Sequence, residues 1–81
     1  MVKKIMHPKI EYLRLLIENP DGVTSSEVEE IWDDVTWDAA RKALFRLYNQ
    51  GCAKRVNEGE YRYWITDRGI QRYHYLTRDE T

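Results

Sequence analysis

The hydrophobic pattern of this chain changes period once, at Gly51, and this change is the strongest constraint on its fold. Before Gly51, apolar residues recur at the three- and four-residue spacing of a buried helix face. After Gly51, two short runs at residues 52–56 and 61–65 read as strands, and the second is rich in aromatic side chains. The chain is therefore predicted to be an α+β protein in which helices precede a β-hairpin.

Three helices are predicted before Gly51. The first begins near Pro8, because proline is tolerated in the first helical turn, and ends at the turn sequence NPDG of residues 19–22. The second begins after Thr24, where residues 24–27 (TSSE) match a capping box. The third has Thr36 as its N-cap and ends at Gly51. The expected inward-facing residues of these helices are Ile10, Leu13, Leu16 and Ile17, then Val28, Ile31 and Trp32, then Ala40, Ala43, Leu44 and Leu47.

A hairpin and a fourth helix are predicted after Gly51. Residues 57–60 (NEGE) connect the strands, and Gly59 can supply a positive φ there. On the second strand, Tyr61, Tyr63 and Ile65 share one face, and Arg62 and Trp64 share the other. Thr66 is expected to cap the last helix, with Ile70, Tyr73 and Leu76 or Thr77 facing inward. We expect one domain spanning residues 1–81, ordered over about residues 8–76.

Composition excludes several classes of protein. No apolar run approaches the roughly 18 residues of a membrane span, and residues 1–8 (MVKKIMHP) lack the apolar core of a signal peptide. A single cysteine, Cys52, excludes an intrachain disulfide framework, so a cytoplasmic location is expected. Cys52 is expected to be a buried thiol, His7 to lie in a frayed N-terminus, and His74 to have no ligand partner. We therefore expect no metal site, no cofactor and no enzymatic activity.

Charge is segregated along the chain. Residues 21–38 carry seven acidic and no basic side chains, whereas residues 39–78 carry nine basic and three acidic ones. This distribution fits either a dispersed, solvated surface or a basic face directed at a polyanion.

Two stretches of the chain resemble known winged helix-turn-helix regulators. Residues 36–51 (TWDAARKALFRLYNQG) are similar to the recognition-helix segment of small bacterial and archaeal repressors. Residues 61–69 (YRYWITDRG) are similar to the strand-to-helix junction of the MarR, PadR and archaeal phage-repressor groups. The resemblance implies a three-helix core, a hairpin wing and a C-terminal helix. It also implies a sequence-specific DNA-binding transcriptional regulator of archaeal or phage type.

The resemblance implies that the helix at residues 36–50 enters the major groove. Arg41 and Lys42 are the strongest candidates for DNA contacts, because Arg can bridge guanine and Lys can contact phosphate or guanine. Asp38 repels phosphate but can accept from cytosine, and Phe45 suits either a thymine methyl group or a protein interface. Trp37 also reads as a half-buried lid on the core. The expected contact residues of this helix are Thr36, Trp37, Asp38, Arg41, Lys42, Phe45 and Arg46.

The hairpin at residues 52–65 is the expected wing, reaching the minor groove or flanking phosphates. Its candidate contact residues are Lys54, Arg55, Asn57 and Arg62. The acidic residues Glu58 and Glu60 near the tip oppose deep insertion. An alternative interpretation is cross-strand pairing of Lys54 or Arg55 with Glu60.

Two functions remain open at this stage. The first is regulation of transcription through double-stranded DNA, with a homodimer formed by the C-terminal helix or the N-terminal segment. The second is a winged-helix protein–protein interaction module without DNA binding, which Phe45, Asp38 and the acidic second helix favour. Neither requires a membrane, and no small-molecule effector is expected because 81 residues leave no room for an effector domain.

Overall fold

A computed structural model describes residues 7–78 of the chain. Residues 1–6 and 79–81 lie outside the described residues. The predictions that concern residues 1–6, namely the lack of a signal peptide and a dimer contact through the N-terminal segment, therefore lie outside them as well. The elements follow in the order α1 (Lys9–Glu18), β1 (Val23–Thr24), α2 (Ser25–Ile31), α3 (Trp37–Asn49), β2 (Ala53–Asn57), β3 (Tyr61–Ile65) and α4 (Asp67–Thr77).

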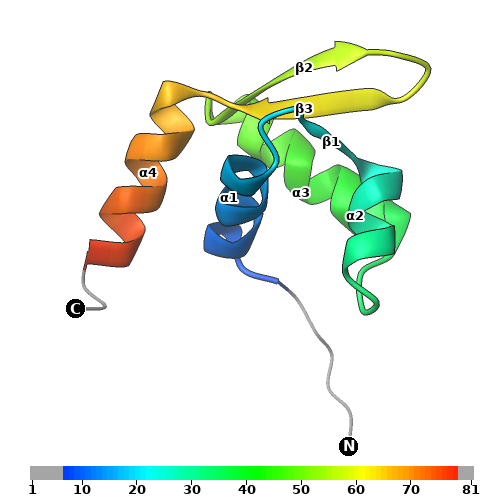
Figure 1. Ribbon diagram of the computed structural model, residues 1–81, viewed down its shortest axis with the longest axis horizontal. Helices are drawn as coiled ribbons and strands as arrows, with labels where there is room; N and C mark the ends of the chain where they lie inside the picture. Colours follow the sequence, from blue (N-terminus) through cyan, green and yellow to red (C-terminus); the bar gives the residue numbers. More distant parts are fainter. Residues whose placement is uncertain (1–6, 79–81) are drawn as a thin grey trace, which may run out of the picture.

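The sheet is antiparallel, with strand order β1-β3-β2, and the helices lie to one side of it (Figure 1). The hairpin of β2 and β3 and the order of the helices are as predicted. Strand β1 is not predicted from the sequence, because two residues are too few to show an alternating pattern. It forms when Val23 pairs with Tyr63, so β3 becomes the central strand.

Threonine side chains set the start of three helices, as the sequence predicts. Thr24 accepts a hydrogen bond from the Glu27 amide at 3.1 Å, and the Glu27 carboxylate accepts one from the Thr24 amide at 3.1 Å, completing the capping box. Thr36 and Thr66 each accept one from the third residue of the following helix, also at 3.1 Å. The caps fix where α2, α3 and α4 begin.

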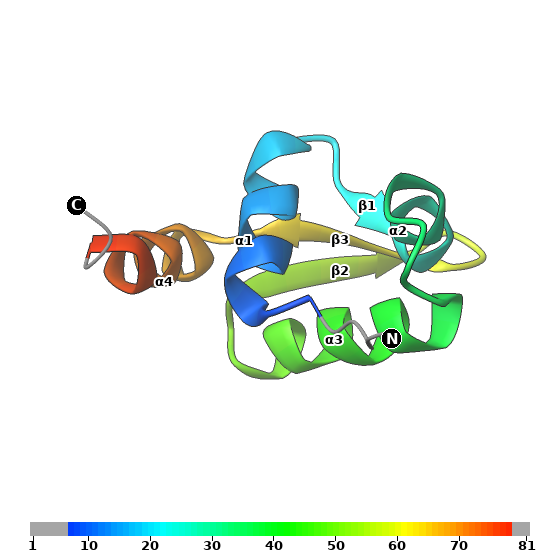
Figure 2. The same ribbon diagram turned by 90° about the horizontal axis from the view of Figure 1, so that it is seen from below.

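The core lies between the helices and the inner face of the sheet. It follows the predicted positions in α3, but in α1 it also includes Tyr12 and Leu15, while Ile10 and Ile17 are only half-buried. This difference arises because α1 packs against α3, α4 and β3 (Figure 2), so more than one side of α1 is covered. The expectation for Ile31 is wrong: its side chain is 48% exposed. Ile31 is the last residue of α2.

His7 does not lie in a frayed end, contrary to expectation. Its ring stacks on Trp32 with centroids 4.0 Å apart, and its Nε2 lies 2.8 Å from a carboxylate oxygen of Asp34. Its Nδ1 is hydrogen-bonded to Glu11. Burial lowers the pKa of His7, but the hydrogen bonds to Asp34 and Glu11 outweigh it and raise the pKa above its ordinary value. His7 thus ties the start of α1 to the segment between α2 and α3.

The junction between β3 and α4 explains the TDRG sequence of residues 66–69. The Thr66 hydroxyl donates to the Gly51 carbonyl at 2.7 Å, and the Thr66 amide donates to the Cys52 carbonyl at 3.1 Å. A Cβ at Gly69 would lie 2.3 Å from that same Cys52 oxygen. Only glycine fits where the first turn of α4 packs against Cys52, the residue before β2. The Cys52 thiol is buried and free, as expected.

Candidate nucleic-acid interface

Helix α3 has one buried side and one exposed side. Ala40, Leu44 and Leu47 are buried in the core, as the helical spacing predicts. The opposite side carries an outward stripe, at spacings of three and four residues, that consists of Asp38, Arg41, Lys42, Phe45 and Asn49, with Arg46 beside it. All six side chains are exposed.

Asp38 forms ion pairs with two cations of this stripe. Its carboxylate oxygens lie 3.0 Å from Arg41 Nη2 and 3.1 Å from Lys42 Nζ. Hydrogen bonds from Arg41 and then Lys42 lower the pKa of Asp38, so it stays ionised near neutral pH. Exposed ion pairs of this kind are weak, and both cations remain available to a stronger anionic partner.

Arg55 lies among three aromatic rings that join α3 to the hairpin. Its guanidinium carbon is 4.2 Å from the ring centroid of Tyr48, 4.0 Å from that of Tyr61 and 5.3 Å from that of Phe45. Its Nη1 lies 3.5 Å from the hydroxyl of Tyr63. We call Phe45, Tyr48, Arg55 and Tyr61 the Arg55 cluster. Stacking of this kind holds Arg55 in place and orders the adjoining rings.

Glu60 attaches the hairpin tip to α2 and α3. Its carboxylate accepts a hydrogen bond from Trp37 Nε1 at 2.7 Å and from the amide of Ser26 at 3.0 Å, and the Ser26 hydroxyl also donates to it. The bonds from Trp37 and Ser26 lower the pKa of Glu60. The alternative interpretation, a cross-strand pair of Glu60 with Lys54 or Arg55, is therefore wrong. Glu60 reaches across to the helices instead.

Trp37 is more exposed than its position in the sequence favoured, which was a half-buried side chain covering the core. Its side chain is 40% exposed, because the first residue of α3 lies beyond the core and the indole extends toward Glu60. A hollow of about 420 Å³ lies beside it, between the start of α2, α3 and the hairpin tip.

Comparison with solved structures finds a similar overall fold in a known regulator. The crystal structure of the transcriptional regulator SlyA matches with a TM-score of 0.73 and 27% sequence identity over 91% of this chain. The present chain is a winged helix-turn-helix domain. It spans about half of the SlyA chain, 54% of its length. No protein-family model matches the sequence, and no curated protein matches it.

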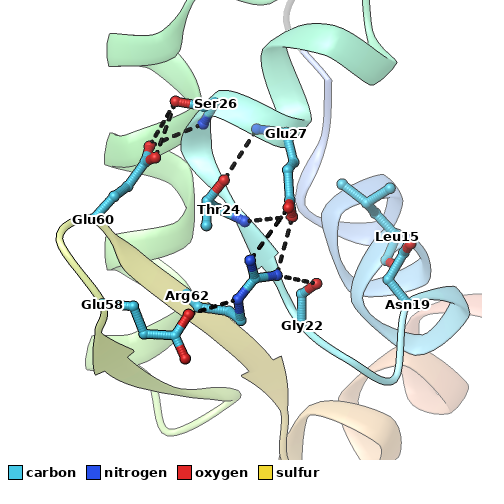
Figure 3. A network of polar contacts seen from close by, with 9 residues as sticks. All are labelled: Leu15, Asn19, Gly22, Thr24, Ser26, Glu27, Glu58, Glu60 and Arg62. Carbon is cyan, nitrogen blue, oxygen red and sulfur yellow. Dashed lines mark hydrogen bonds and ion pairs between the residues drawn. The ribbon is translucent and has the colours of Figure 1, made fainter.

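In this winged helix, α2 and α3 form the helix-turn-helix and the β2–β3 hairpin forms the wing. Arg62 belongs to the wing, but its guanidinium turns inward (Figure 3). It lies 3.2 Å from Glu27, 3.0 Å from Glu58 and 3.1 Å from the Gly22 carbonyl oxygen, and only 25% of its side chain is exposed. Sequence analysis predicted that Arg62, like Arg55, contacts nucleic acid. In the structure, Arg62 instead makes internal contacts between the wing and α2.

The remaining candidate residues of the winged helix differ in how freely they face solvent. Arg46 and Lys54 are exposed, and no carboxylate of residues 7–78 forms an ion pair with either. Asn57 accepts a hydrogen bond from the Gly59 amide at 3.0 Å and so shapes the wing turn. The Thr36 hydroxyl is already used as the N-cap of α3.

Sequence reasoning missed two residues of this surface, Tyr48 and Tyr61. Tyr48 follows Phe45 by three residues, which indicates a shared helix side. The contacts of Tyr48 and Tyr61 with Arg55 depend on how the hairpin packs on α3, and no local sequence pattern predicts this packing.

Within residues 7–78, no helix has the length and apolar character needed to cross a membrane. The same residues contain no group of three or more His, Cys, Asp or Glu side chains arranged to hold a metal ion.

Proposed function

We propose that this chain is a sequence-specific DNA-binding transcriptional regulator that places α3 in the major groove of double-stranded DNA. The wing, carrying Lys54 and Arg55, contacts the minor groove or the flanking phosphates. The likeness to SlyA, a transcriptional regulator, supports this general function. A cytoplasmic site of action and a homodimer on two half-sites belong to the same proposal.

One observation carries the proposal: the exposed side of α3 holds three cations, Arg41, Lys42 and Arg46. In a winged helix this is the side that faces the major groove. Arg41 can bridge the O6 and N7 acceptors of guanine, whereas Lys42 and Arg46 suit phosphates. Asp38 pairs with Arg41 and Lys42 in the free protein, and DNA phosphate replaces it as their partner in the complex.

The proposal is tested by titrating labelled duplexes with the protein at several salt concentrations. Binding through phosphates predicts that log affinity falls with log salt at a slope of about −0.9 per phosphate contacted. Lys54→Ala should weaken binding to all sequences and reduce the slope by about one contact. Arg41→Ala should cost about 1–3 kcal/mol on the preferred site and relax its specificity.

Arg72→Ala is the matched control for both variants. Arg72 is an exposed arginine on α4, which lies at the far end of the molecule from the wing tip (Figure 2). On a duplex that carries a single half-site, its loss should leave DNA affinity and salt slope nearly unchanged. If Arg41→Ala and Lys54→Ala leave affinity and salt slope as unchanged as Arg72→Ala does, the basic residues face solvent without binding DNA and the proposal fails.

A protein–protein interaction module is the second candidate, because the same surface exposes aromatic rings. Trp37, Phe45 and Tyr48 are each about two-fifths exposed, and such side chains are enriched at protein interfaces. This function predicts no salt-sensitive duplex binding by the wild-type protein. The titration above therefore separates the two candidates.

A further inference from the structure

Phe45 is the apolar member of an otherwise polar stripe on α3. Arg41 and Lys42 precede it by one turn, and Asn49 follows it by one turn. Its side chain is 39% exposed because the core lies on the other side of the helix. A ring in this place faces whatever α3 binds.

The Arg55 cluster orders the ring of Phe45. The rings of Phe45 and Tyr48 are stacked, with centroids 6.3 Å apart and planes at 28°. The guanidinium of Arg55 covers Phe45 at 5.3 Å and is itself held between Tyr48 and Tyr61. A ring that is already ordered loses little conformational entropy when a ligand contacts it.

The major groove offers one apolar group for such a ring, the 5-methyl group of thymine. Every other base edge there presents hydrogen-bond donors or acceptors that a phenyl ring leaves unpaired. We infer that Phe45 contacts the 5-methyl group of a thymine and makes an A·T pair at that position part of the preferred site. This inference rests on the proposed function and adds a source of specificity to it.

The test begins with the wild-type protein. Duplexes that it binds are selected from a random pool, and each thymine of the preferred site is then replaced singly by deoxyuridine, which lacks only the methyl group. Replacement at one thymine should lower affinity about fourfold, the factor expected for burying one methyl group. Replacement at the other thymines should change affinity little.

Variants assign this effect to Phe45. In Phe45→Ala, the same thymine-to-deoxyuridine replacement should no longer change affinity, because the apolar partner is gone. Phe45→Leu keeps an apolar side chain and should keep most of the methyl effect. Arg41→Ala is the matched comparison: it should bind more weakly but retain the full methyl effect.

The outcomes separate this inference from the proposed function. If the wild-type protein binds duplex DNA but no single deoxyuridine weakens binding, or if the effect persists in Phe45→Ala, the inference is wrong and DNA binding stands. If the wild-type protein binds no duplex even at low salt, the proposed function fails and the inference fails with it.

Discussion

Arg55 and Arg62 lie on neighbouring strands of the wing, yet their guanidinium groups have different partners. Arg62 pairs with Glu27 and Glu58 and is mostly covered, whereas Arg55 stacks on aromatic rings beside α3. A guanidinium already paired with two carboxylates is a poor partner for phosphate. The count of basic residues after residue 38 therefore overstates the positive charge that the wing presents.

Asp38 is expected to weaken DNA binding. Replacing Asp38 with Asn removes a negative charge that competes with phosphate for Arg41 and Lys42. Affinity for random duplex should rise about fivefold, as expected for losing one repulsive contact at the surface. Asp67→Asn, which removes an acid from the first turn of α4, should leave affinity unchanged. Equal affinity for wild type and Asp38→Asn would contradict this role.

His7 is expected to stabilise the fold in a pH-dependent way. Its pKa is raised in the folded state, so folding favours the protonated ring that faces Asp34 and Glu11. The stabilisation should be complete below the ordinary His value of 6.5 and should disappear as pH rises through the raised pKa. Urea unfolding of wild type and His7→Gln should therefore differ most in mildly acidic buffer. A difference that grows with pH would contradict the assignment.

At the scale of elements, the approach of α4 to β2 depends on Gly69. Alanine there would place its Cβ 2.3 Å from the Cys52 carbonyl oxygen and 2.6 Å from Ile65 Cδ1. Because the nearest atom is backbone, the strain cannot be relieved by turning a side chain, and we expect a loss of about 1–3 kcal/mol in unfolding free energy. Gln71→Ala, an exposed change on the same helix, should cost nothing measurable by urea unfolding. An unchanged unfolding free energy for Gly69→Ala would contradict this account, because it would mean that α4 can shift away from Cys52 at no cost.

Local signals predicted most of these elements and few of their contacts. The caps at Thr24, Thr36 and Thr66 gave correct helix starts because a cap depends on three or four adjacent residues. Strand β1 was missed because it exists through pairing with β3, about forty residues away. In the site, helical spacing was enough to predict which side of α3 is exposed. The Arg55 cluster and the inward orientation of Arg62 could not be predicted, because they depend on how the wing packs against the helices.

At the scale of the whole molecule, the wing tip and α4 lie at opposite ends (Figure 2). Helix α3 begins beside the wing tip, and its C-terminal end lies close to α4, where Gln50 lines the same hollow as Tyr75, which is 51% exposed. The position of α4 away from the wing leaves its exposed side available to a second copy while the wing and the first turns of α3 bind DNA, as two half-sites would require.

Self-association through α4 is therefore expected. Sedimentation should show a dimer, at least on a duplex that carries two half-sites, and Tyr75→Ala should weaken it while leaving binding to a single half-site intact. A strict monomer both alone and on the two-half-site duplex would remove the dimer and leave the fold and the DNA surface unaffected.

The most direct test of the account is a map of the DNA surface by solution NMR. Backbone amide shifts of the protein are compared with and without a selected duplex at saturation. We predict large changes along the exposed side of α3, at Arg41, Lys42, Phe45 and Arg46, and smaller ones in the wing at Lys54 and Arg55. The amides of α4 should change little on a single half-site. Changes confined to α4, or none on α3 at saturating duplex, would contradict the claim that α3 reads DNA.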